Sequence, residues 1–411
     1  MIKKLILQNF KSIASASVDF DCLTFLVGRN GSGKSNIADA LAFLAESAEW
    51  PLQTVFNRRG GALNVVHRQS VPSPRTLTGP ASEFGIGIEF ENVPGWSPEY
   101  EQEQVSGRYG FLLAISRTGF EVLREQCIIN RANGKRVWFD RVKSETRSSL
   151  DLLNESRPPF ILPDALAMPF AGSLPELTAA LMVLKSIGIY SIDPGKLQEF
   201  QDPDEGKRLL SDGSNAASVL RGLRSDSVEF RRLFEILSTV VPDLARVRPQ
   251  TIGRKQHLRF YQQWSETGRL GFDAFNMSDG TLRAFGILLA LFQNDRPDLL
   301  LIEEPETSLH PAATAAIVET LIQESKRSQI IISTHSPEVL DFAGSSEDNF
   351  KIVSWDKGRT NIGSVDGVAR ASLQQHLATA GELFRMRILD APQLFEKTED
   401  DSQQSLFGEL E

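Results

Sequence analysis

The sequence predicts an α/β fold in which a mixed sheet is shared by the two ends of the chain and a helical lobe is inserted between them. A short apolar run, residues 23–27, leads into a glycine-rich loop and then a helical pattern. Two further apolar runs, 298–304 and 329–334, are typical of buried parallel strands. The residues between these parts carry helical patterns. The core is therefore expected to be discontinuous.

Composition narrows the class of protein. The chain has 411 residues, 41% of them hydrophobic, and only two cysteines, Cys22 and Cys127, which is too few for a disulfide framework. No apolar run approaches the roughly 20 residues of a membrane-spanning helix, so we expect a cytoplasmic protein without a membrane partner. The net charge of −9 argues against coating nucleic acid through the overall field. Local basic groups remain candidates for DNA contact, namely Lys3 with Lys4, Arg58 with Arg59, and Arg254, Lys255, His257 and Arg259.

The first part of the chain, residues 1–150, is expected to form one half of the nucleotide-binding lobe. Residues 4–12 mix apolar and polar side chains as a strand does, and 17–20 are its expected hairpin partner. Further strand-like stretches predict a mixed or antiparallel sheet built onto the core; they are 84–90, 109–115, 122–129 and 137–139.

Residues 151–285 are expected to form the helical lobe. Helical patterns cover 174–186, 215–223 and 228–241. Repeated prolines forbid one continuous long helix, and the many uninterrupted heptads of a long coiled coil are missing.

The second half of the nucleotide-binding lobe is expected at 286–390. Its two apolar runs are joined by a helix that begins at Pro311, a favourable position in the first turn. The end of the chain, 391–411, is rich in acidic, Gln and Ser residues and is expected to be a flexible tail.

The glycine-rich loop reads Gly28-Arg29-Asn30-Gly31-Ser32-Gly33-Lys34-Ser35, a complete G-x-x-x-x-G-K-S phosphate loop between a strand and a helix. In such a loop the backbone N–H groups and the helix N-terminus face phosphates. Lys34 is expected to reach the β- and γ-phosphates, and the Ser35 hydroxyl to ligate Mg²⁺. The sequence therefore predicts a nucleotide site.

Three further motifs follow in order. They are 275–283, which contains Ser278-Asp279-Gly280; 299–306, which contains Glu303-Glu304-Pro305-Glu306; and Ser333-Thr334-His335. Together with the phosphate loop, this series resembles the ABC-type ATPases, specifically the SMC/RecF/OLD-like branch of predicted AAA ATPases. The runs 9–12, 33–36 and 278–283 are typical of that branch. The resemblance implies a P-loop NTPase of the ABC-ATPase head type.

The resemblance also implies roles for individual residues. Glu303, which stands where the family usually has Asp, would lie beside Mg²⁺, and Glu304 would polarise the attacking water. His335 would be the switch histidine that contacts the γ-phosphate. Ser278 and Gly280 would bind the γ-phosphate of a nucleotide held by another subunit, which implies a homodimer around two ATP molecules.

Some assignments are less closely tied to a motif. By resemblance, Lys11 and Ser12 would approach the α- and β-phosphates or the ribose, and Asn36 would support the Mg²⁺ shell. The family's glutamine loop has three candidates, which are Gln69, Gln198 and Gln201. Residues 403–407 resemble the bacterial sliding-clamp-binding pentapeptide, with Gln404 in place of the usual Leu. They imply either docking on a clamp or anchoring of another partner through Leu406 and Phe407.

The expected function is an ATP-driven, dimerising switch that controls engagement of DNA or an effector protein in DNA repair or antiviral defence. The residues after His335 carry no acidic metal cluster, so we expect no nuclease domain in this chain. One alternative is an ATP sensor or scaffold with negligible turnover that controls a partner effector. A further alternative is the motor subunit of a membrane transporter, but the branch-specific motifs disfavour it.

Overall fold

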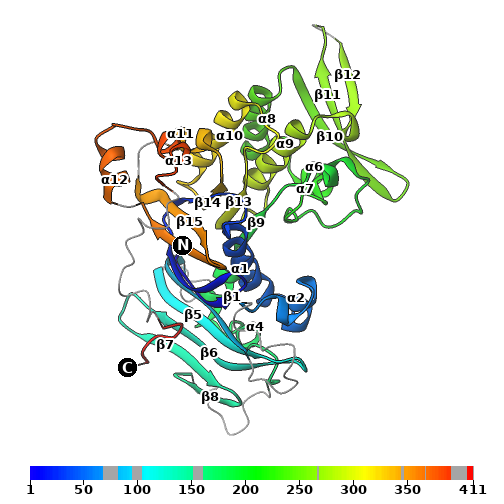
Figure 1. Cartoon of the computed structure of the whole chain (residues 1–411). Helices are drawn as coiled ribbons and strands as arrows, with labels where there is room; N and C mark the ends of the chain where they lie inside the picture. Colours follow the sequence, from blue (N-terminus) through cyan, green and yellow to red (C-terminus); the bar gives the residue numbers. More distant parts are fainter. Residues whose placement is uncertain are drawn as a thin grey trace.

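The computed structural model describes residues 1–67, 82–94, 104–150, 161–265, 268–343, 347–365, 367–389 and 405–410. Within them the chain forms a six-stranded sheet, a seven-stranded sheet and a separate three-stranded sheet, with helices packed between and around them (Figure 1). The expected α/β fold with a mixed core sheet is thus confirmed. Both ends of the chain contribute strands to the six-stranded sheet, as the discontinuous core required.

The six-stranded sheet has the order β16-β15-β3-β14-β13-β9. All its neighbours pair in parallel except the β15–β16 hairpin. Its strands are β3 (Leu23–Val27), β9 (Ile187–Tyr190), β13 (Leu299–Glu303), β14 (Gln329–Thr334), β15 (Phe350–Asp356) and β16 (Arg359–Ser364). Because the carboxyl ends of parallel strands share one edge, the phosphate loop after β3, the glutamates after β13 and His335 after β14 meet there.

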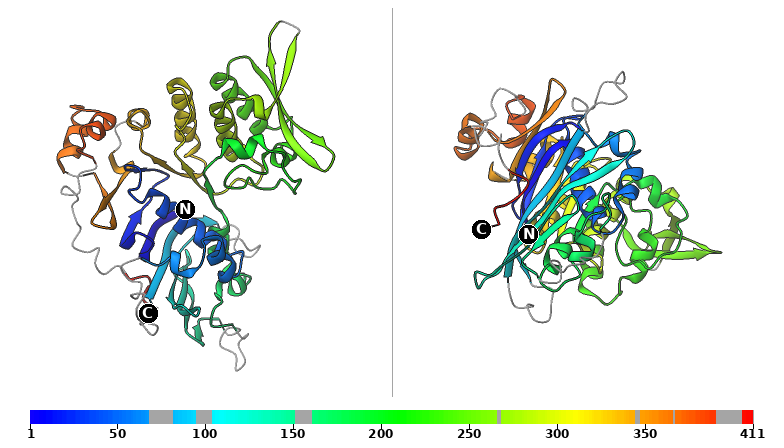
Figure 2. Two further views of the ribbon diagram at one scale, coloured as in Figure 1. Left: turned by 45° about the vertical axis from the view of Figure 1, so that its right-hand side comes forward. Right: turned by 90° about the horizontal axis from the view of Figure 1, so that it is seen from below.

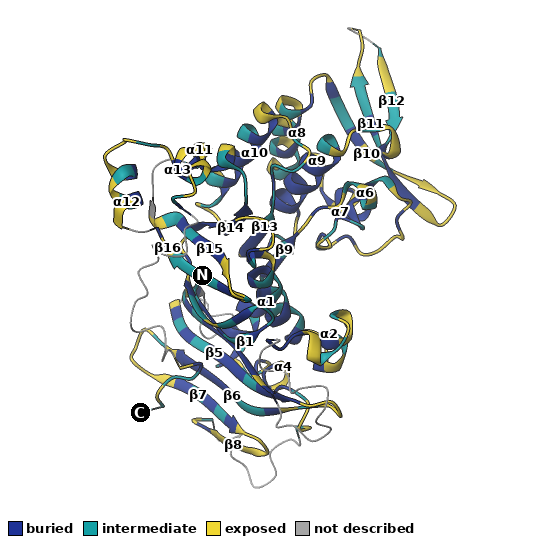
Figure 3. Ribbon diagram, viewed as in Figure 1, coloured by how far each residue is buried: buried dark blue, intermediate teal, exposed yellow. Residues whose placement is uncertain are grey.

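Helices cover both faces of this sheet. Neighbouring residues of β3 belong to different hydrophobic cores. Leu26 belongs to the core that includes α1 (Lys34–Ser47), and Phe25 to the core that includes α9 (Asp279–Phe292) and α10 (Pro311–Glu324). Figure 3 shows the resulting buried interior on either side of the strands. The strands are continuous apolar runs because both faces of a parallel sheet are buried under helices.

The seven-stranded sheet is antiparallel, with the order β2-β1-β4-β5-β6-β7-β8. The expected hairpin is confirmed, and β2 begins earlier than expected, at Ile13. Phe84 and Phe111 pack on Phe43 of α1, so the sheet supports the helix that follows the phosphate loop. The strands are β1 (Ile2–Phe10), β2 (Ile13–Asp19), β4 (Ser82–Pro94), β5 (Gln104–Ile115), β6 (Phe120–Asn130), β7 (Arg136–Val142) and β8 (Glu145–Ser148).

The middle of the chain is less purely helical than expected. It contains α4 (Met168–Ala171), α5 (Thr178–Lys185), α6 (Pro194–Gln198), α7 (Ala216–Gly222) and α8 (Val228–Val240). It also contains β9 and a projecting three-stranded arm, β10 (Leu244–Ile252), β11 (Lys255–Gln263) and β12 (Arg269–Asp273) (Figure 2). Describing 151–285 as a helical lobe was wrong for these strands. The alternation of buried Leu258 and Phe260 with polar neighbours was the available signal.

The C-terminal part adds α11 (Pro337–Phe342), α12 (Gly367–Gln374) and α13 (Ala380–Arg385). Residues 405–410 lie against the seven-stranded sheet, with Leu406 only 2% exposed, so the expectation of a flexible tail was wrong for them. Residues 390–404 and 411 lie outside the described residues. In the part of the chain that the structure describes, no helix is long and apolar enough to cross a membrane. Short helices complete the fold: α2 (Leu52–Arg58), η1 (Ala62–Asn64), η3 (Ala274–Asn276) and η4 (Glu347–Asn349).

Candidate functional site: a nucleotide-binding edge of the parallel sheet

The phosphate loop has the backbone that its glycines permit. Gly31 and Gly33 have φ of 78° and 110°, in the region that favours glycine. A Cβ on Gly28 would lie 2.1 Å from the Val353 carbonyl oxygen, so this glycine is required by close packing. The N-terminus of α1 receives no side-chain cap. Its orphan N–H groups and the positive end of the helix dipole therefore suit an anionic ligand such as a phosphate.

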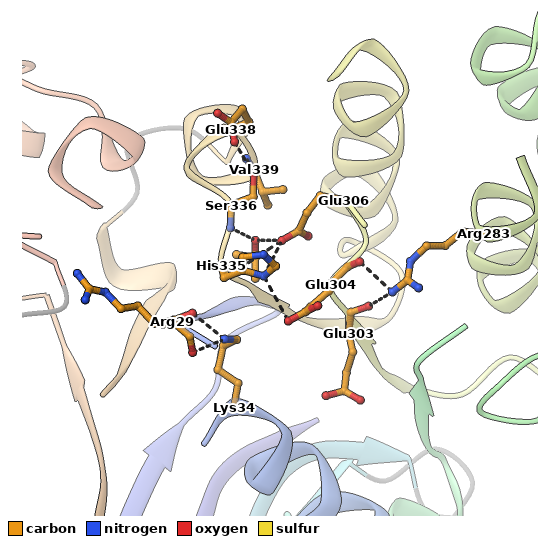
Figure 4. A network of polar contacts seen from close by, with 12 residues as sticks. Arg29, Lys34, Arg283, Glu303, Glu304, Glu306, His335, Ser336, Glu338 and Val339 are labelled. Atoms are coloured by element: carbon orange, nitrogen blue, oxygen red, sulfur yellow. Dashed lines mark hydrogen bonds and ion pairs between the residues drawn. The ribbon is translucent and has the colours of Figure 1, made fainter. Parts of the chain in front are cut away.

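Lys34 lies inside this loop and is only 5% exposed (Figure 4). Its Nζ donates hydrogen bonds to the Gly28 and Arg29 carbonyl oxygens, at 2.6 and 3.0 Å. Burial lowers the pKa of Lys34, against the opposing attraction of the glutamates that follow β13. The ammonium group is thus held where a phosphate group could exchange for the carbonyl oxygens. The Arg29, Asn30 and Ser35 side of the loop is exposed.

Ser12 and Asn36, which were assigned by resemblance, do adjoin the loop. Asn36 Nδ2 donates to Ser12 Oγ at 2.5 Å, and Ser12 Oγ lies 2.6 Å from Thr360 Oγ1. Thr360 Oγ1 also donates to the Ser32 carbonyl oxygen at 2.9 Å. Thr360 lies in β16, in the β15–β16 hairpin, and its hydrogen bond to Ser32 supports the phosphate loop. Sequence reasoning missed it, because a single threonine far along the chain carries no motif.

Lys11 lies beside α1 rather than against the phosphate loop. Its Nζ makes an ion pair with Asp39 Oδ2 at 2.7 Å, and Arg59 contacts the same carboxylate. Its predicted contact with the α- and β-phosphates or the ribose stays a prediction.

Carboxylates and a histidine gather at the ends of β13 and β14. Glu304 has a left-handed φ of 44°, and its Oε1 lies 3.3 Å from His335 Nδ1. Glu306 Oε1 accepts hydrogen bonds from Thr334 Oγ1 at 2.7 Å and from the His335 backbone N–H at 3.3 Å. Glu304, Glu306 and His335 line a cavity of about 520 Å³. The structure therefore brings Glu304 and His335 together as expected.

Glu306 was quoted within its motif but was given no role by sequence reasoning. It fixes the backbone of His335, and its Oε2 atom is buried without a hydrogen-bond partner among the described residues. The sequence signal that could have identified Glu306 is its position, two residues after Glu304 in the loop that follows β13.

Arg283 joins the 278–283 motif to the glutamates (Figure 4). This arginine of α9 donates from Nη2 to the Glu303 and Glu304 carbonyl oxygens, both at 3.0 Å, and from Nη1 to the Ile192 carbonyl oxygen at 2.8 Å. Burial lowers the pKa of the Arg283 guanidinium. A movement of α9 would therefore move the backbone that carries both glutamates.

Ser278 and Gly280 mark the exposed N-terminal end of α9. Ser278 Oγ accepts the Thr281 N–H at 3.2 Å and so caps the helix. A Cβ on Gly280 would lie 2.4 Å from the Ser308 carbonyl oxygen, which explains the glycine by close packing. Neither residue lines the cavity that contains Glu304 and His335. Within this motif, Arg283 therefore contacts the backbone of the predicted glutamates, whereas Ser278 and Gly280 do not line their cavity.

The three glutamine candidates fare differently. Gln69 lies outside the described residues. Gln198 Nε2 lies 3.4 Å from Asp279 Oδ1, beside the 278–283 motif. Gln201 is 4% exposed and bonds to backbone groups in the middle of the chain. Both described glutamines thus contact protein groups outside the cavity.

The donors present suit magnesium. No group of three or more His, Cys, Asp or Glu side chains among the described residues could hold a metal ion by itself. Magnesium is commonly held by one or two protein oxygens, with phosphates and waters as its other ligands. The exposed Ser35 hydroxyl and the partly exposed Glu303 carboxylate fit that pattern.

Comparisons with known proteins identify a family and a similar fold. Residues 23–341 match the family described as "AAA domain, putative AbiEii toxin, Type IV TA system". The DNA replication and repair protein RecF of Francisella tularensis subsp. novicida and of subsp. tularensis is 47% identical over 47 residues, which are 11% of this chain and 14% of each relative.

Among solved structures, an Smc head bound to the C-terminal winged-helix domain of ScpA has a TM-score of 0.51 at 18% identity, covering 90% of this chain and 99% of that one. An Smc head with an extended coiled coil, bound to the C-terminal domain of ScpA from Pyrococcus furiosus, has a TM-score of 0.50 at 16% identity, covering 92% and 99%. These likenesses show the fold. The chain belongs to the AAA-domain family described above, and its fold is similar to that of Smc heads.

Proposed function

We propose that this chain binds and hydrolyses ATP, and that two copies close head to head around two ATP molecules in the cytoplasm. One observation carries the proposal. Ser278, at the N-terminal end of α9, is exposed, and neither it nor Gly280 lines the cavity of Glu304 and His335. A second copy could supply that end to each nucleotide. ATP would then stabilise the closed state because it contacts both copies only there.

The chemistry follows from the positions of the side chains. Lys34 and the N-terminus of α1 would hold the phosphates, and bound Mg²⁺, beside Ser35 and Glu303, would neutralise phosphate charge. Glu304 would orient and polarise the attacking water. His335, held by Glu304 and Glu306, would contact the γ-phosphate.

The hydrolytic cycle would reach the rest of the molecule through Arg283. Its hydrogen bonds to the backbone of Glu303 and Glu304 tie α9 to the catalytic edge. The same helix carries the surface that would face the second copy, so nucleotide state and dimer geometry would change together.

DNA is the partner that the projecting arm favours. Arg248 and Arg259 are paired in the register of β10 and β11, and Arg246 pairs with Tyr261, so all four share one face. Arg269 continues that face on β12. This basic, aromatic surface contrasts with the net charge of −9 and could contact phosphate backbones, as in repair or antiviral defence.

The proposal also reinterprets the basic group at 254–259. Lys255 makes an ion pair with Asp202 at 2.6 Å, and His257 lies 3.0 Å from Asp273. Arg259 also contacts Asp273, with 3.9 Å between Nε and Oδ1, so the other arginines of this face, Arg246, Arg248 and Arg269, are the stronger candidates for DNA contact.

The decisive experiment uses Glu304→Gln, which should slow hydrolysis about 100-fold or more while retaining ATP. With ATP and Mg²⁺ this variant should elute as a dimer in size-exclusion chromatography with light scattering. Ser278→Arg is the matched control; it should bind ATP and stay monomeric because a bulky cation replaces the capping hydroxyl. A monomeric Glu304→Gln variant at saturating ATP would overturn the proposal.

A second experiment tests the DNA partner. Duplex DNA at low salt should raise the steady-state ATPase rate, and the stimulation should fade as salt rises. Arg248→Glu should lose it, whereas Arg221→Glu, on the exposed end of α7, should keep it. An unchanged rate with DNA would favour a protein effector.

The second candidate function is an ATP sensor that controls an effector with negligible turnover. It is favoured by Glu303, which is one methylene longer than the usual Asp and would displace the metal contact. Turnover below about one ATP per hour, far under the usual enzyme range, would select this candidate.

A further inference from the structure

The outer face of the seven-stranded sheet has an unusual strip without side chains. β4 reads Phe84-Gly-Ile-Gly-Ile-Glu-Phe90, and its Phe and Ile side chains are buried in the core. Gly85 and Gly87 therefore face outward, and Gly110 of β5 is paired with Gly87. Glycine weakens the interior of a strand and commonly marks a close approach by another backbone.

The C-terminal segment of the chain makes that approach. Leu406 is 2% exposed, and a Cβ added to Gly85 would lie 2.2 Å from Leu406 Cδ1. A Cβ on Gly110 would lie 3.0 Å from the Leu406 carbonyl oxygen. The glycines thus form the floor of a groove that accepts one leucine and its backbone.

Polar side chains on the same face bind the backbone of the segment. Gln126 Oε1 accepts the Gly408 N–H at 2.7 Å, and its Nε2 donates to the Gly408 carbonyl oxygen at 3.2 Å. Arg108 and Arg136 donate to the Ser405 and Glu409 carbonyl oxygens, both at 3.1 Å. These contacts recognise the backbone of the segment irrespective of most of its side chains.

A third arginine recognises the residue after the leucine. The Arg124 guanidinium lies 4.3 Å from the centre of the Phe407 ring, in the geometry of a cation–π contact.

We propose that the outer face of β4, β5 and β6 is a peptide-docking groove whose ligand is residues 405–410 of this same chain. The docked segment buries Leu406 and engages Phe407, so neither can be offered to another protein at the same time. The groove is therefore a latch on the C-terminal segment, and release from it precedes any partner contact through these two residues. This inference is independent of ATP hydrolysis.

The first test uses amide hydrogen exchange on the full chain. Residues 406–410 should exchange at least about 10-fold more slowly than in a free peptide of residues 402–411, and Gln126→Ala should abolish the difference. Glu409→Ala is the matched control, since only its backbone is contacted, and it should keep the protection. Exchange at the free-peptide rate in the unmodified chain would overturn the proposal, as would protection that disappears on dilution, which would indicate docking between two copies.

The second test measures access to the segment. An antibody raised against residues 402–411 should associate at least about 10-fold faster with Gln126→Ala than with the unmodified chain. Gly85→Ala, which places a methyl group against Leu406, should behave like Gln126→Ala. Equal association rates for all three proteins would refute the latch.

Discussion

The two large sheets each contain a cluster of charged side chains, and the clusters differ in how fully their polar atoms are satisfied. In the seven-stranded sheet, Glu125 and Arg141 are 0% and 1% exposed, and Tyr109 is buried with them. In the parallel sheet, Glu304 and His335 are 36% and 37% exposed beside a cavity. One cluster is sealed in the core, and the other is open to a ligand.

The sealed cluster has a partner for each of its charges. Glu125 accepts hydrogen bonds from the backbone N–H groups of Ala167 and Met168, at 2.5 and 2.8 Å, and from the Tyr109 hydroxyl at 3.0 Å. Arg141 donates to the Leu162, Ala165 and Lys143 carbonyl oxygens. The cluster therefore attaches the chain around 162–168 to the sheet, which is an architectural role.

The open cluster keeps unsatisfied atoms. Glu306 Oε2 is buried without a hydrogen-bond partner in the described part of the chain, and Lys34 Nζ donates to the backbone carbonyl oxygens of Gly28 and Arg29 in its own loop. A buried charged cluster whose polar atoms are all hydrogen-bonded internally therefore has a structural role. Polar atoms left without partners beside a cavity indicate a ligand-binding site instead.

The largest expected effect breaks the sealed cluster. Glu125→Ala leaves two backbone N–H groups and the Arg141 guanidinium buried without their partner, so the free energy of unfolding should fall by about 3–5 kcal/mol. Chemical denaturation measures it. Glu121→Ala, at an exposed position of the same strand, should change it by less than about 0.5 kcal/mol. A small effect of Glu125→Ala would contradict an architectural role.

A smaller effect is expected at the open cluster, and on binding rather than folding. Lys34→Ala should weaken ATP affinity about 100-fold, or about 2.8 kcal/mol, because the phosphates lose a buried ammonium group. Isothermal titration calorimetry would measure the affinity. The denaturation midpoint without nucleotide should change little. A large loss of stability would contradict the assignment of a binding role to the open cluster and a structural role to the sealed one.

The pH dependence of stability sharpens the comparison further. Burial raises the pKa of Glu125 above 4.5, with the hydrogen bonds and Arg141 opposing the shift. The folded chain thus binds this proton more tightly than the unfolded chain, and the contribution to stability falls as pH rises from 4.5 through the raised pKa, by at most about 1.4 kcal/mol per pH unit. Glu125→Gln should flatten that decline in denaturation curves recorded across the window. An unchanged slope would exclude Glu125 as its origin.

The smallest expected effect concerns the brace outside the phosphate loop. Thr360→Val removes the hydroxyl that bonds to Ser32 and contacts Ser12, at a cost of about 1 kcal/mol, so ATP affinity should fall several-fold. Fluorescent-nucleotide titration would detect it. Thr251→Val, on the exposed arm, is the control; equal affinity for the two variants would remove Thr360 from the site.

Sequence alone determined the contiguous parts of the site. The phosphate loop, the glutamates after β13 and His335 after β14 are each preceded by a short apolar run, and parallel strands bring such termini to one edge whatever the intervening chain does. Their local patterns therefore predict both the strands and their meeting place. The same reasoning predicted a mixed or antiparallel sheet built onto the core, because its strands carry strong local patterns, and the structure shows antiparallel pairing.

Tertiary structure decided what depends on distant partners. Thr360 reaches Ser32 across the fold, Arg283 holds the backbone of Glu304, and Leu406 fills a groove floored by glycines of β4 and β5. The arm formed by β10–β12 did leave an alternating pattern around Leu258 and Phe260, which was overlooked, but the docked C-terminal segment was missed for the same reason as these contacts. Such contacts are selected by shape and by the satisfaction of buried polar groups, and neither leaves a periodic trace along the sequence.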